Sequence, residues 1–413
     1  MTQAYRANRM GVDFRHPAHH AAFRESAFSP AASKIASMPG LSIHFDASTP
    51  DRPWSDTVAG RDARAVTAYS SDLIAALGEL ESLAGTDRWA GFINYDAGGC
   101  FEVLPRRAID DLRLPLLSFA KCDRAVVAPK SERTLAATSA QPRSNFSRNE
   151  YESAVQRCLD YIAAGDVFQI NLSQRFSAPF AGDPWSLYER LRTSYPAEFG
   201  AFLDFGDFQL LSNSPELFLR VTELPDGRRR IVNRPIKGTR PNSPGMRDAL
   251  LHSEKDKAEL AMIVDLQRND LGRICQIGSV KVIEPRAIES HPTVLHGVAT
   301  IEGILRPEVT LVDILRATFP CGSVTGCPKI RAMQIIDELE PVRRGAYCGA
   351  IGWVQGRELE LAVAIRTMTI KDGQVHIPVG GGIVADSDPA AEYEETIVKA
   401  AAMFSALSLH LKR

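Results

Sequence analysis

The sequence lacks a basic excess, a membrane-length apolar run and a secretory leader. Its 413 residues include 48 Lys and Arg against 50 Asp and Glu, so the formal net charge is −2. Proteins that bind nucleic acid through phosphates usually carry a clear positive excess. A membrane-spanning helix needs about 20 consecutive apolar residues, whereas long uncharged stretches such as 345–356 are shorter and glycine-rich, and residues 1–25 hold no apolar signal-peptide core. We therefore expect a soluble, cytoplasmic protein without nucleic-acid or membrane partners.

The cysteines lack the arrangement of a stapled or zinc-binding protein. Seven cysteines are present, an odd number, and no two of them form a C-x-x-C pair. This pattern argues against a disulfide framework and against a zinc ribbon. Hydrophobic residues make up 45% and charged residues 24% of the chain, which excludes an intrinsically disordered protein. Reduced, mostly buried thiols are the expected state.

A change of composition divides the chain. Residues 129–147 are rich in Ser, Thr, Arg and Pro, which is typical of a surface connection. We therefore predict an N-terminal part, 1–146, that packs on a catalytic core, 147–413. Ser147 and Glu150 form a capping box at the start of a helix.

The remaining pattern indicates the fold class. Apolar and polar residues alternate over 168–176, which predicts a half-buried strand. We also predict one helix over Met246–Asn269 and one strand over Glu358–Ile370. Runs of strands interrupted by single helices favour an α+β fold with antiparallel sheets.

Carboxylates gather in two helical segments. Asp256 and Glu259 lie three residues apart and so share a helix face. Glu392, Glu395 and Lys399 fall within about 60° of each other on the last helix. These residues form either solvated charged faces or a site for a hard cation, and Mg²⁺ fits oxygen ligands of this kind. Zinc would need His or Cys, and the one H-x-x-x-H pair, His16 and His20, reads as a solvated tail.

Glycines and cations complete the candidate chemistry. Gly380–Gly382 precede the last helix and form either a tight turn or a backbone cradle for an anion. Arg366, in an apolar strand, is either half of a structural ion pair or a carboxylate-binding group. Lys237, between two prolines, is either a loop residue or, if buried, a nucleophile. The segment 320–329 fails the phosphate-loop pattern, so we reject nucleotide binding there.

Long motifs in a fixed order give these residues a common context. PIKGTRP, AELAMIVDLQRNDLGRIC, LHGVATIEG, GSVTGCPKIRAMQIIDELEP, AYCGAIGW, AVAIRT and GGGIVADSDPAAEYEETIVKA follow one another. Together they resemble the chorismate-utilising enzymes, most densely over 151–403. The N-terminal part is similar mainly at 89–95 and 101–102. The resemblance implies an anthranilate-synthase-component-I-like α+β fold, with two packed, largely antiparallel sheets and helices on the outside.

The resemblance also implies roles for particular residues. Glu259 and Glu395 match Mg²⁺-associated glutamates, and Asp256 and Glu392 belong to the surrounding acidic shell. Lys237, His296 and Glu259 match catalytic positions. The residues that match substrate-binding positions are Gly238, Thr239, Ser323, Thr325, Tyr347, Arg366, Gly380, Gly381, Gly382 and Lys399.

Two positions point to one branch of the family. Isochorismate and salicylate synthases carry a water-activating lysine where this chain has Gln169, which is not a useful base. Lys237 in PIKGT resembles aminodeoxychorismate synthase component I, where it is proposed to attack ring C2. This implies conversion of chorismate and ammonia to 4-amino-4-deoxychorismate, on the route to p-aminobenzoate and folate. No glutaminase motif is visible, so a separate glutamine amidotransferase subunit is expected as the ammonia source.

Two alternatives remain open at this point. One is anthranilate synthase component I. The resemblance suggests that the 45–48 stretch could line a tryptophan pocket in such an enzyme. The other is a chorismate-binding paralogue that does not catalyse a reaction.

Overall fold

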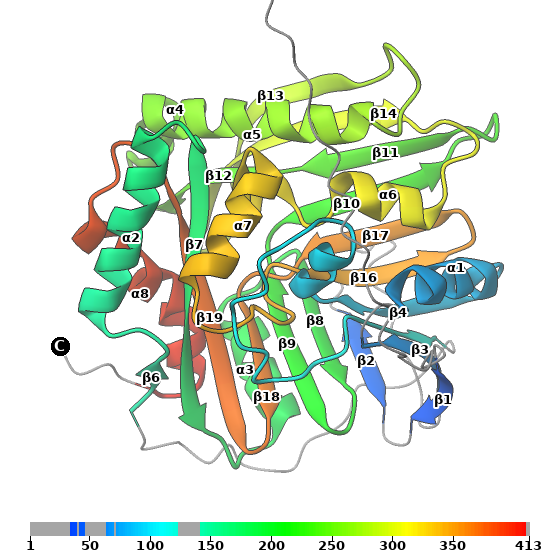
Figure 1. Cartoon of the computed structure of the whole chain (residues 1–413), viewed down its shortest axis with the longest axis horizontal. Helices are drawn as coiled ribbons and strands as arrows, with labels where there is room; N and C mark the ends of the chain where they lie inside the picture. Colours follow the sequence, from blue (N-terminus) through cyan, green and yellow to red (C-terminus); the bar gives the residue numbers. More distant parts are fainter. Residues whose placement is uncertain (1–33, 39–40, 46–62, 70–71, 123–140, 410–413) are drawn as a thin grey trace, which may run out of the picture. The chain divides into compact units, whose positions relative to one another are not determined.

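Strands from both parts of the chain build two sheets in the computed structural model (Figure 1). It describes residues 34–38, 41–45, 63–69, 72–122 and 141–409. Three segments discussed above lie outside the described residues: the His16–His20 pair, residues 46–48 of the stretch that could line a tryptophan pocket in the anthranilate synthase alternative, and residues 129–140 of the expected connection. Every strand pairing in the described part of the chain is antiparallel, which confirms the predicted fold class.

The first sheet has eleven strands among the described residues. Its order is β1 (Lys34–Met38), β3 (Ala63–Ala68), β5 (Leu117–Lys121), β4 (Arg88–Ile93), β16 (Ala350–Gln355), β17 (Glu358–Val363), β10 (Leu217–Glu223), β11 (Arg229–Arg234), β14 (Val294–Ile304) and β12 (Ile236–Pro241), with β13 (Lys281–Ser290) also paired to β14. Because β4 pairs with β16 along its whole length, this sheet uses residues from both sides of position 146. The boundary between 1–146 and 147–413 stays a prediction.

The second sheet has eight strands within the same described ranges. Its order is β15 (Gly326–Cys327), β7 (Gln169–Pro179), β19 (Gln374–Ile383), β18 (Thr367–Lys371), β9 (Phe208–Ser214), β8 (Phe199–Asp204) and β2 (Ser42–Phe45), with β6 (Arg143–Ser144) also paired to β7. The two long strands β7 and β19 pair over ten residues. β19 carries the three glycines of the site described below, Gly380–Gly382.

Helices cover the outer faces of the sheets (Figure 1). They are α1 (Leu73–Ala84), α2 (Arg148–Ala163), α3 (Pro184–Ser194), α4 (Met246–Leu251), α5 (Glu254–Gly272), α6 (Leu311–Thr318), α7 (Lys329–Leu339) and α8 (Pro389–Ala406), with 3₁₀ turns η2 (Tyr95–Cys100) and η3 (Gly322–Val324). Apolar side chains of α1, α5 and α6 pack on the first sheet, and those of α3 and α8 on the second. A third cluster, which includes Phe92, Phe199 and Trp353, joins the two sheets. None of the described helices is both long and apolar enough to cross a membrane.

Local signals placed some elements correctly. The Ser147 side chain accepts from the backbone N–H of Glu150, and the Glu150 side chain accepts from that of Ser147, so the capping box is confirmed. The hairpin at Gln355–Gly356 joins β16 to β17, and Gly356 has a φ of 59° that suits glycine. These features depend on neighbours in the sequence, which is why the sequence alone reveals them.

Two predicted elements were wrong. The helix expected over Met246–Asn269 is two helices, because the Ser253 hydroxyl accepts from the backbone N–H of Asp256 and starts α5 anew. The strand expected over Glu358–Ile370 is also two strands, which belong to different sheets. Arg366 lies in the crossing between them with a φ of 50°, so it is not a strand residue.

Candidate active site

The three glycines of β19 lie between an acidic helix and a lysine. A Cβ atom on Gly381 would be 3.1 Å from Glu392 Oε2 and 3.4 Å from Glu395 Oε1. A Cβ atom on Gly382 would be 3.3 Å from Lys237 Nζ. Successive strand residues face opposite sides of a sheet, so α8 approaches one face of this segment and Lys237 the other. The space at both faces depends on the absence of side chains, which favours a cradle over a simple turn.

The carboxylates on the α8 side have unequal partners. Lys399 Nζ lies 2.6 Å from Glu395 Oε1 and donates to the Gly380 carbonyl at 3.0 Å. Burial alone would raise the pKa of Glu395, but the ammonium group of Lys399 outweighs it and holds the pKa below its usual value. Glu392 accepts from the Ser387 hydroxyl with Oε1, whereas its buried Oε2 has no hydrogen-bond partner among the described residues. Burial, and then the nearby Glu395 charge, raise the pKa of Glu392.

The α5 carboxylates face the same region. Burial raises the pKa of Glu259, against the opposing charge of Lys237. Lys255 Nζ lies 4.0 Å from Glu259 Oε1. Asp256 is paired with Arg240 at 2.8 Å, and a Cβ atom on Gly238 would meet Asp256 Cγ at 2.9 Å. Gly238 therefore has to be glycine both for this close approach and for its φ of 82°.

The oxygen atoms of these carboxylates are of the kind that Mg²⁺ accepts as ligands, but they do not form a complete site. Within the described residues, no three His, Cys, Asp or Glu side chains converge closely enough to hold a metal by themselves. Mg²⁺ usually takes one or two carboxylates and completes its shell with water and substrate oxygens. The unpartnered Glu392 Oε2, next to Glu395 Oε1 across Gly381, offers such an incomplete oxygen set.

The side chain of Lys237, on β12, lies among several charged side chains. Burial of its ammonium group lowers its pKa, while the carboxylates of Glu259 and Glu216 act in the opposite direction. The side-chain amide of Gln169 meets the same glycine face, since a Cβ atom on Gly382 would clash with its Nε2. The lysine is therefore held inside the site and is not a surface loop residue.

Glu216 is the site residue that the sequence analysis missed. It is buried at the start of β10, and its Oε1 accepts from the Ser323 hydroxyl at 2.5 Å. Burial raises its pKa to about 7, against the opposing effects of Ser323 and Lys237. A usable signal existed in the sequence, because a charged residue directly precedes the apolar run Leu217–Leu219.

A histidine and an arginine lie on the same side of the site. His296 is buried on β14, and its Nδ1 is 2.9 Å from the Thr239 hydroxyl. Burial, and then the charges of Arg366 and His291, lower the pKa of His296 to about 3. The ring is therefore neutral, and its Nε2 has no partner in the described structure.

The sequence left two alternatives for Arg366, half of a structural ion pair or a carboxylate-binding group, and the structure distinguishes them. No salt bridge to it exists within the described residues, and the opposing charge that acts on its pKa is that of Glu216. Burial lowers the pKa of the guanidinium. A bound anion would offset the free-energy cost of burying this unpaired charge. A structural ion pair is thereby excluded for the described part of the chain.

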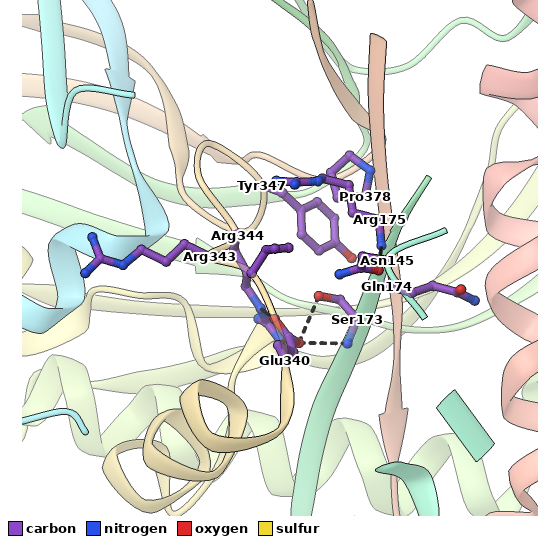
Figure 2. Close-up of a pocket in the computed structure, with 10 residues that line it drawn as sticks. Asn145, Ser173, Gln174, Arg175, Glu340, Arg343, Arg344, Tyr347 and Pro378 are labelled. Carbon is purple, nitrogen blue, oxygen red and sulfur yellow. Dashed lines mark hydrogen bonds and ion pairs between the residues drawn. The ribbon is translucent and has the colours of Figure 1, made fainter. Parts of the chain in front are cut away.

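Three further predicted residues, Ser323, Thr325 and Tyr347, come from η3 and from the turn before β16. Ser323 and Thr325 are buried in and after η3, and the Thr325 hydroxyl donates to the Cys321 carbonyl at 3.0 Å. Tyr347 lies in the turn before β16 and lines a pocket with Ser173 and Arg344 (Figure 2). Among the described residues, no hydrogen bond joins Tyr347 to Arg366. The structure therefore brings together the predicted residues of β12, α5, β19 and α8, and places Tyr347 at their edge.

Comparison with known proteins assigns the class to which this chain belongs. Residues 130–405 match the family model described as chorismate binding enzyme. The chain therefore belongs to the chorismate-binding enzyme family.

Two kinds of named relative are similar to this chain over most of its length. The chain is 46% identical over 274 residues to anthranilate synthase component 1 of Pseudomonas putida, covering 65% of this chain and 55% of that protein. It is 41% identical over 341 residues to aminodeoxychorismate synthase component 1 of Salmonella typhimurium, covering 75% and 74%. The crystal structure of anthranilate synthase component I from Streptococcus pneumoniae TIGR4 matches with a TM-score of 0.71 and 30% identity, covering 94% of this chain and 95% of that one. The chain spans about half the length of the Pseudomonas relative.

Proposed function

We propose that this chain adds ammonia to ring C4 of chorismate and yields 4-amino-4-deoxychorismate, the reaction of an aminodeoxychorismate synthase component I. The observation that carries the proposal is Lys237, whose Nζ would lie 3.3 Å from a Cβ atom on Gly382, inside the cradle, with a pKa lowered by burial. The lowered pKa favours the neutral amine, which is the nucleophilic form of lysine.

The chemistry proceeds by two displacements. Lys237 Nζ attacks C2, both conjugated ring double bonds shift by one position (C1=C2 to C1=C6 and C5=C6 to C4=C5), and the C4–O bond breaks. Ammonia then attacks C4, both double bonds shift back, and the C2–N bond to Lys237 breaks. The enolpyruvyl group stays in place throughout. Lys237 leaves as a neutral amine, and the new ammonium group on C4 loses one proton, which balances the proton taken up by the leaving hydroxyl.

Glu216 is the proton source that we propose for the leaving hydroxyl. Its pKa of about 7 keeps part of the population protonated at neutral pH. Because the pKa of Lys237 is lowered while that of Glu216 is raised, the pair can exist as amine and carboxylic acid. The hydroxyl then leaves as water.

The substrate is a dianion, and cationic groups are placed to receive it. We propose that Lys399 and the amides of Gly380–Gly382 bind the ring carboxylate, and that Arg366 and Tyr347 bind the enolpyruvyl carboxylate. Glu259, Glu392 and Glu395 would hold Mg²⁺, with Asp256 in the surrounding shell. The ion would supply positive charge against the ring carboxylate. His296, neutral because of its burial, would donate or accept one hydrogen bond beside the substrate.

Ammonia would come from a separate glutamine amidotransferase subunit. The names of the relatives support a two-component enzyme, because both kinds are called component 1.

Anthranilate synthase is the second candidate, and sequence identity favours it. The Pseudomonas relative is 46% identical to this chain, against 41% for the Salmonella aminodeoxychorismate synthase. Lys237 argues in the other direction, since amination at C2 has no use for a nucleophile that occupies C2.

The product of chorismate, ammonium chloride and Mg²⁺ tests the proposed function. We expect a chromatographic peak of 4-amino-4-deoxychorismate, which a lyase converts to p-aminobenzoate, and no anthranilate. Anthranilate as the main product would replace this proposal with the second candidate. Tight chorismate binding without any turnover would instead indicate a non-catalytic paralogue.

The pH dependence of the first displacement tests the role of Glu216. Without ammonia, the rate of water release from chorismate should follow a bell-shaped profile that falls as pH rises through about 7, because Glu216 loses the proton it donates. Glu216→Gln should remove this alkaline limb and slow the step by roughly 10²- to 10⁴-fold. An alkaline limb that persists in Glu216→Gln would assign it to another group. Single-turnover quench experiments measure both.

A further inference from the structure

Arg344 is a buried arginine beside the site to which the proposed chemistry gives no role. Its side chain is 2% exposed, and it forms an ion pair with Glu340, whose side chain is 4% exposed. Nη2 of Arg344 donates to Glu340 Oε1 at 2.7 Å, and Nε donates to Glu340 Oε2 at 2.9 Å. This two-point contact needs the planar fork of a guanidinium, which the ammonium group of lysine does not have.

The guanidinium also donates to two backbone carbonyls from different parts of the fold. Nη1 donates to the Val324 carbonyl of η3 at 2.9 Å, and Nη2 donates to the Asn171 carbonyl of β7. The backbone N–H of Asn171 in turn donates to the Thr325 carbonyl at 2.8 Å. Two successive carbonyls that follow Ser323 are therefore held in place, one by Arg344 and one by β7.

Glu340 and Tyr95 fix the position of the arginine itself. Glu340 Oε1 accepts from both the backbone N–H and the hydroxyl of Ser173, each at 2.8 Å (Figure 2). The ring of Tyr95 lies against the guanidinium, with 4.6 Å between Arg344 Cζ and the ring centroid. A buried polar network with paired members is rigid and specifies one geometry. Arg344 therefore holds η3 in one position.

The segment held by Arg344 carries the hydroxyl that binds Glu216. Ser323 directly precedes Val324, and its hydroxyl donates to Glu216 Oε1 at 2.5 Å. Because Oε1 accepts this hydrogen bond, the acidic proton of Glu216 is left to Oε2. A displacement of η3 would break the hydrogen bond and free the carboxyl group to rotate.

We propose that Arg344 is a positioning residue for the proton donor: it holds η3 so that Ser323 fixes the orientation of the Glu216 carboxyl group. This inference rests on the proposed function, in which Glu216 protonates the leaving hydroxyl. No hydrogen bond joins Arg344 to Glu216 among the described residues, so the arginine acts through the backbone of η3.

The surroundings of Glu216 allow a change at η3 to be recognised from the pH dependence. Four charged or titratable groups interact electrostatically with its carboxyl group, namely Lys237, Arg366, Cys321 and Cys348. Burial raises the pKa of the Cys321 thiol to about 11 and that of the Cys348 thiol to about 12, so both thiols stay neutral near pH 7. The hydrogen bond from Ser323 lowers the pKa of Glu216, so loss of this bond raises it.

The alkaline limb of the water-release rate tests the positioning role. Ser323→Ala should move this limb to higher pH, because Glu216 loses a hydrogen-bond donor. Arg344→Lys keeps the charge but loses the planar fork. It should move the limb in the same direction and slow the step roughly 10²-fold, as expected for a misplaced group, while KM for chorismate changes less than about threefold.

Arg343→Lys is the matched control on the same turn. Arg343 pairs with Asp110 at 3.1 Å, and its side chain is 31% exposed. Its replacement should leave both the alkaline limb and the rate of water release unchanged.

A double variant separates positioning from a general loss of structure. Because Arg344 is proposed to act through Ser323, Arg344→Lys combined with Ser323→Ala should move the limb no further than Ser323→Ala alone. Shifts that add in the double variant would overturn the proposal, as would an unmoved limb in Ser323→Ala or in a folded Arg344→Lys enzyme. A rise in KM alone would also overturn it, since Arg344 would then act in substrate binding.

A second pair of substitutions covers the case in which Arg344→Lys does not fold. Arg344→Met combined with Glu340→Gln removes both buried charges together, so that neither is left unpaired. It should move the limb to higher pH as Ser323→Ala does, and an unmoved limb would again overturn the positioning role. An unsubstituted enzyme that forms no 4-amino-4-deoxychorismate contradicts the proposed function itself, whereas normal product formation with unmoved limbs contradicts only the role of Arg344.

Discussion

Lys237→Ala should abolish formation of 4-amino-4-deoxychorismate from chorismate and ammonium. The lysine is the one group in the proposed sequence whose nitrogen forms and breaks a bond to the substrate, so its loss removes a covalent path and not merely a contact. We expect kcat to fall by at least about 10³-fold with chorismate affinity changed far less. The distinction matters, because a residue that only bound substrate would raise KM instead.

The intermediate itself offers a second measurement. In the absence of ammonia, the unsubstituted enzyme should accumulate an adduct on Lys237 with the mass of chorismate minus water, detected by intact-protein mass spectrometry after acid quench. Lys281→Ala, a change at an exposed lysine on β13, is the control and should retain both the adduct and the activity. Unchanged product formation by Lys237→Ala, with no adduct in either protein, would remove the covalent role.

The fold could be predicted where neighbours in the sequence decide it. The Ser147–Glu150 capping box and the Gly356 hairpin are local features, and the structure confirms both. The prediction of one strand over Glu358–Ile370 was wrong. The segment is hydrophobic along its length, but its two halves pair with different strands. β17 pairs with β10 and β16, whereas β18 pairs with β9 and β19. Periodicity does not reveal which sheet a residue joins.

The candidate site also contains some residues that local sequence patterns predict and others that depend on distant parts of the chain. Spacing on one helix grouped Glu392, Glu395 and Lys399 correctly, because it depends on 3.6 residues per turn. Glu216 escaped notice because its importance comes from residues far away in sequence, such as Ser323, which lies 107 positions further on. The unpartnered buried atoms of Gln169 and Asn171 on β7 are likewise invisible in sequence, since alternation predicts the face of a side chain but not whether a hydrogen-bond partner lies beside it.

Glu395→Gln and Glu259→Gln should each abolish magnesium-dependent turnover. Both substitutions keep the shape of the side chain and remove one negative charge from the surroundings of Lys237. We expect Mn²⁺ affinity, followed by electron paramagnetic resonance as a probe of the Mg²⁺ site, to fall by roughly 10- to 100-fold, which is a readout independent of activity. In Glu395→Gln the effect has a second component, because Lys399 loses the carboxylate at 2.6 Å that holds it. Chorismate binding measured without metal should therefore change in Glu395→Gln more than in Glu259→Gln.

Glu394→Gln is the matched control on the same helix. Glu394 is exposed and pairs with Arg148 at 2.8 Å, so its loss should leave Mn²⁺ affinity and turnover unchanged. Chelation by EDTA should reproduce the metal-dependent loss in the unsubstituted enzyme, and added Mg²⁺ should reverse it. Full activity in EDTA would contradict the metal assignment, and the acidic residues of α5 and α8 would then serve only to balance Lys237, Lys255 and Lys399. Saturable Mn²⁺ binding distinguishes the two roles of these carboxylates, because a role in charge balance alone predicts no such binding.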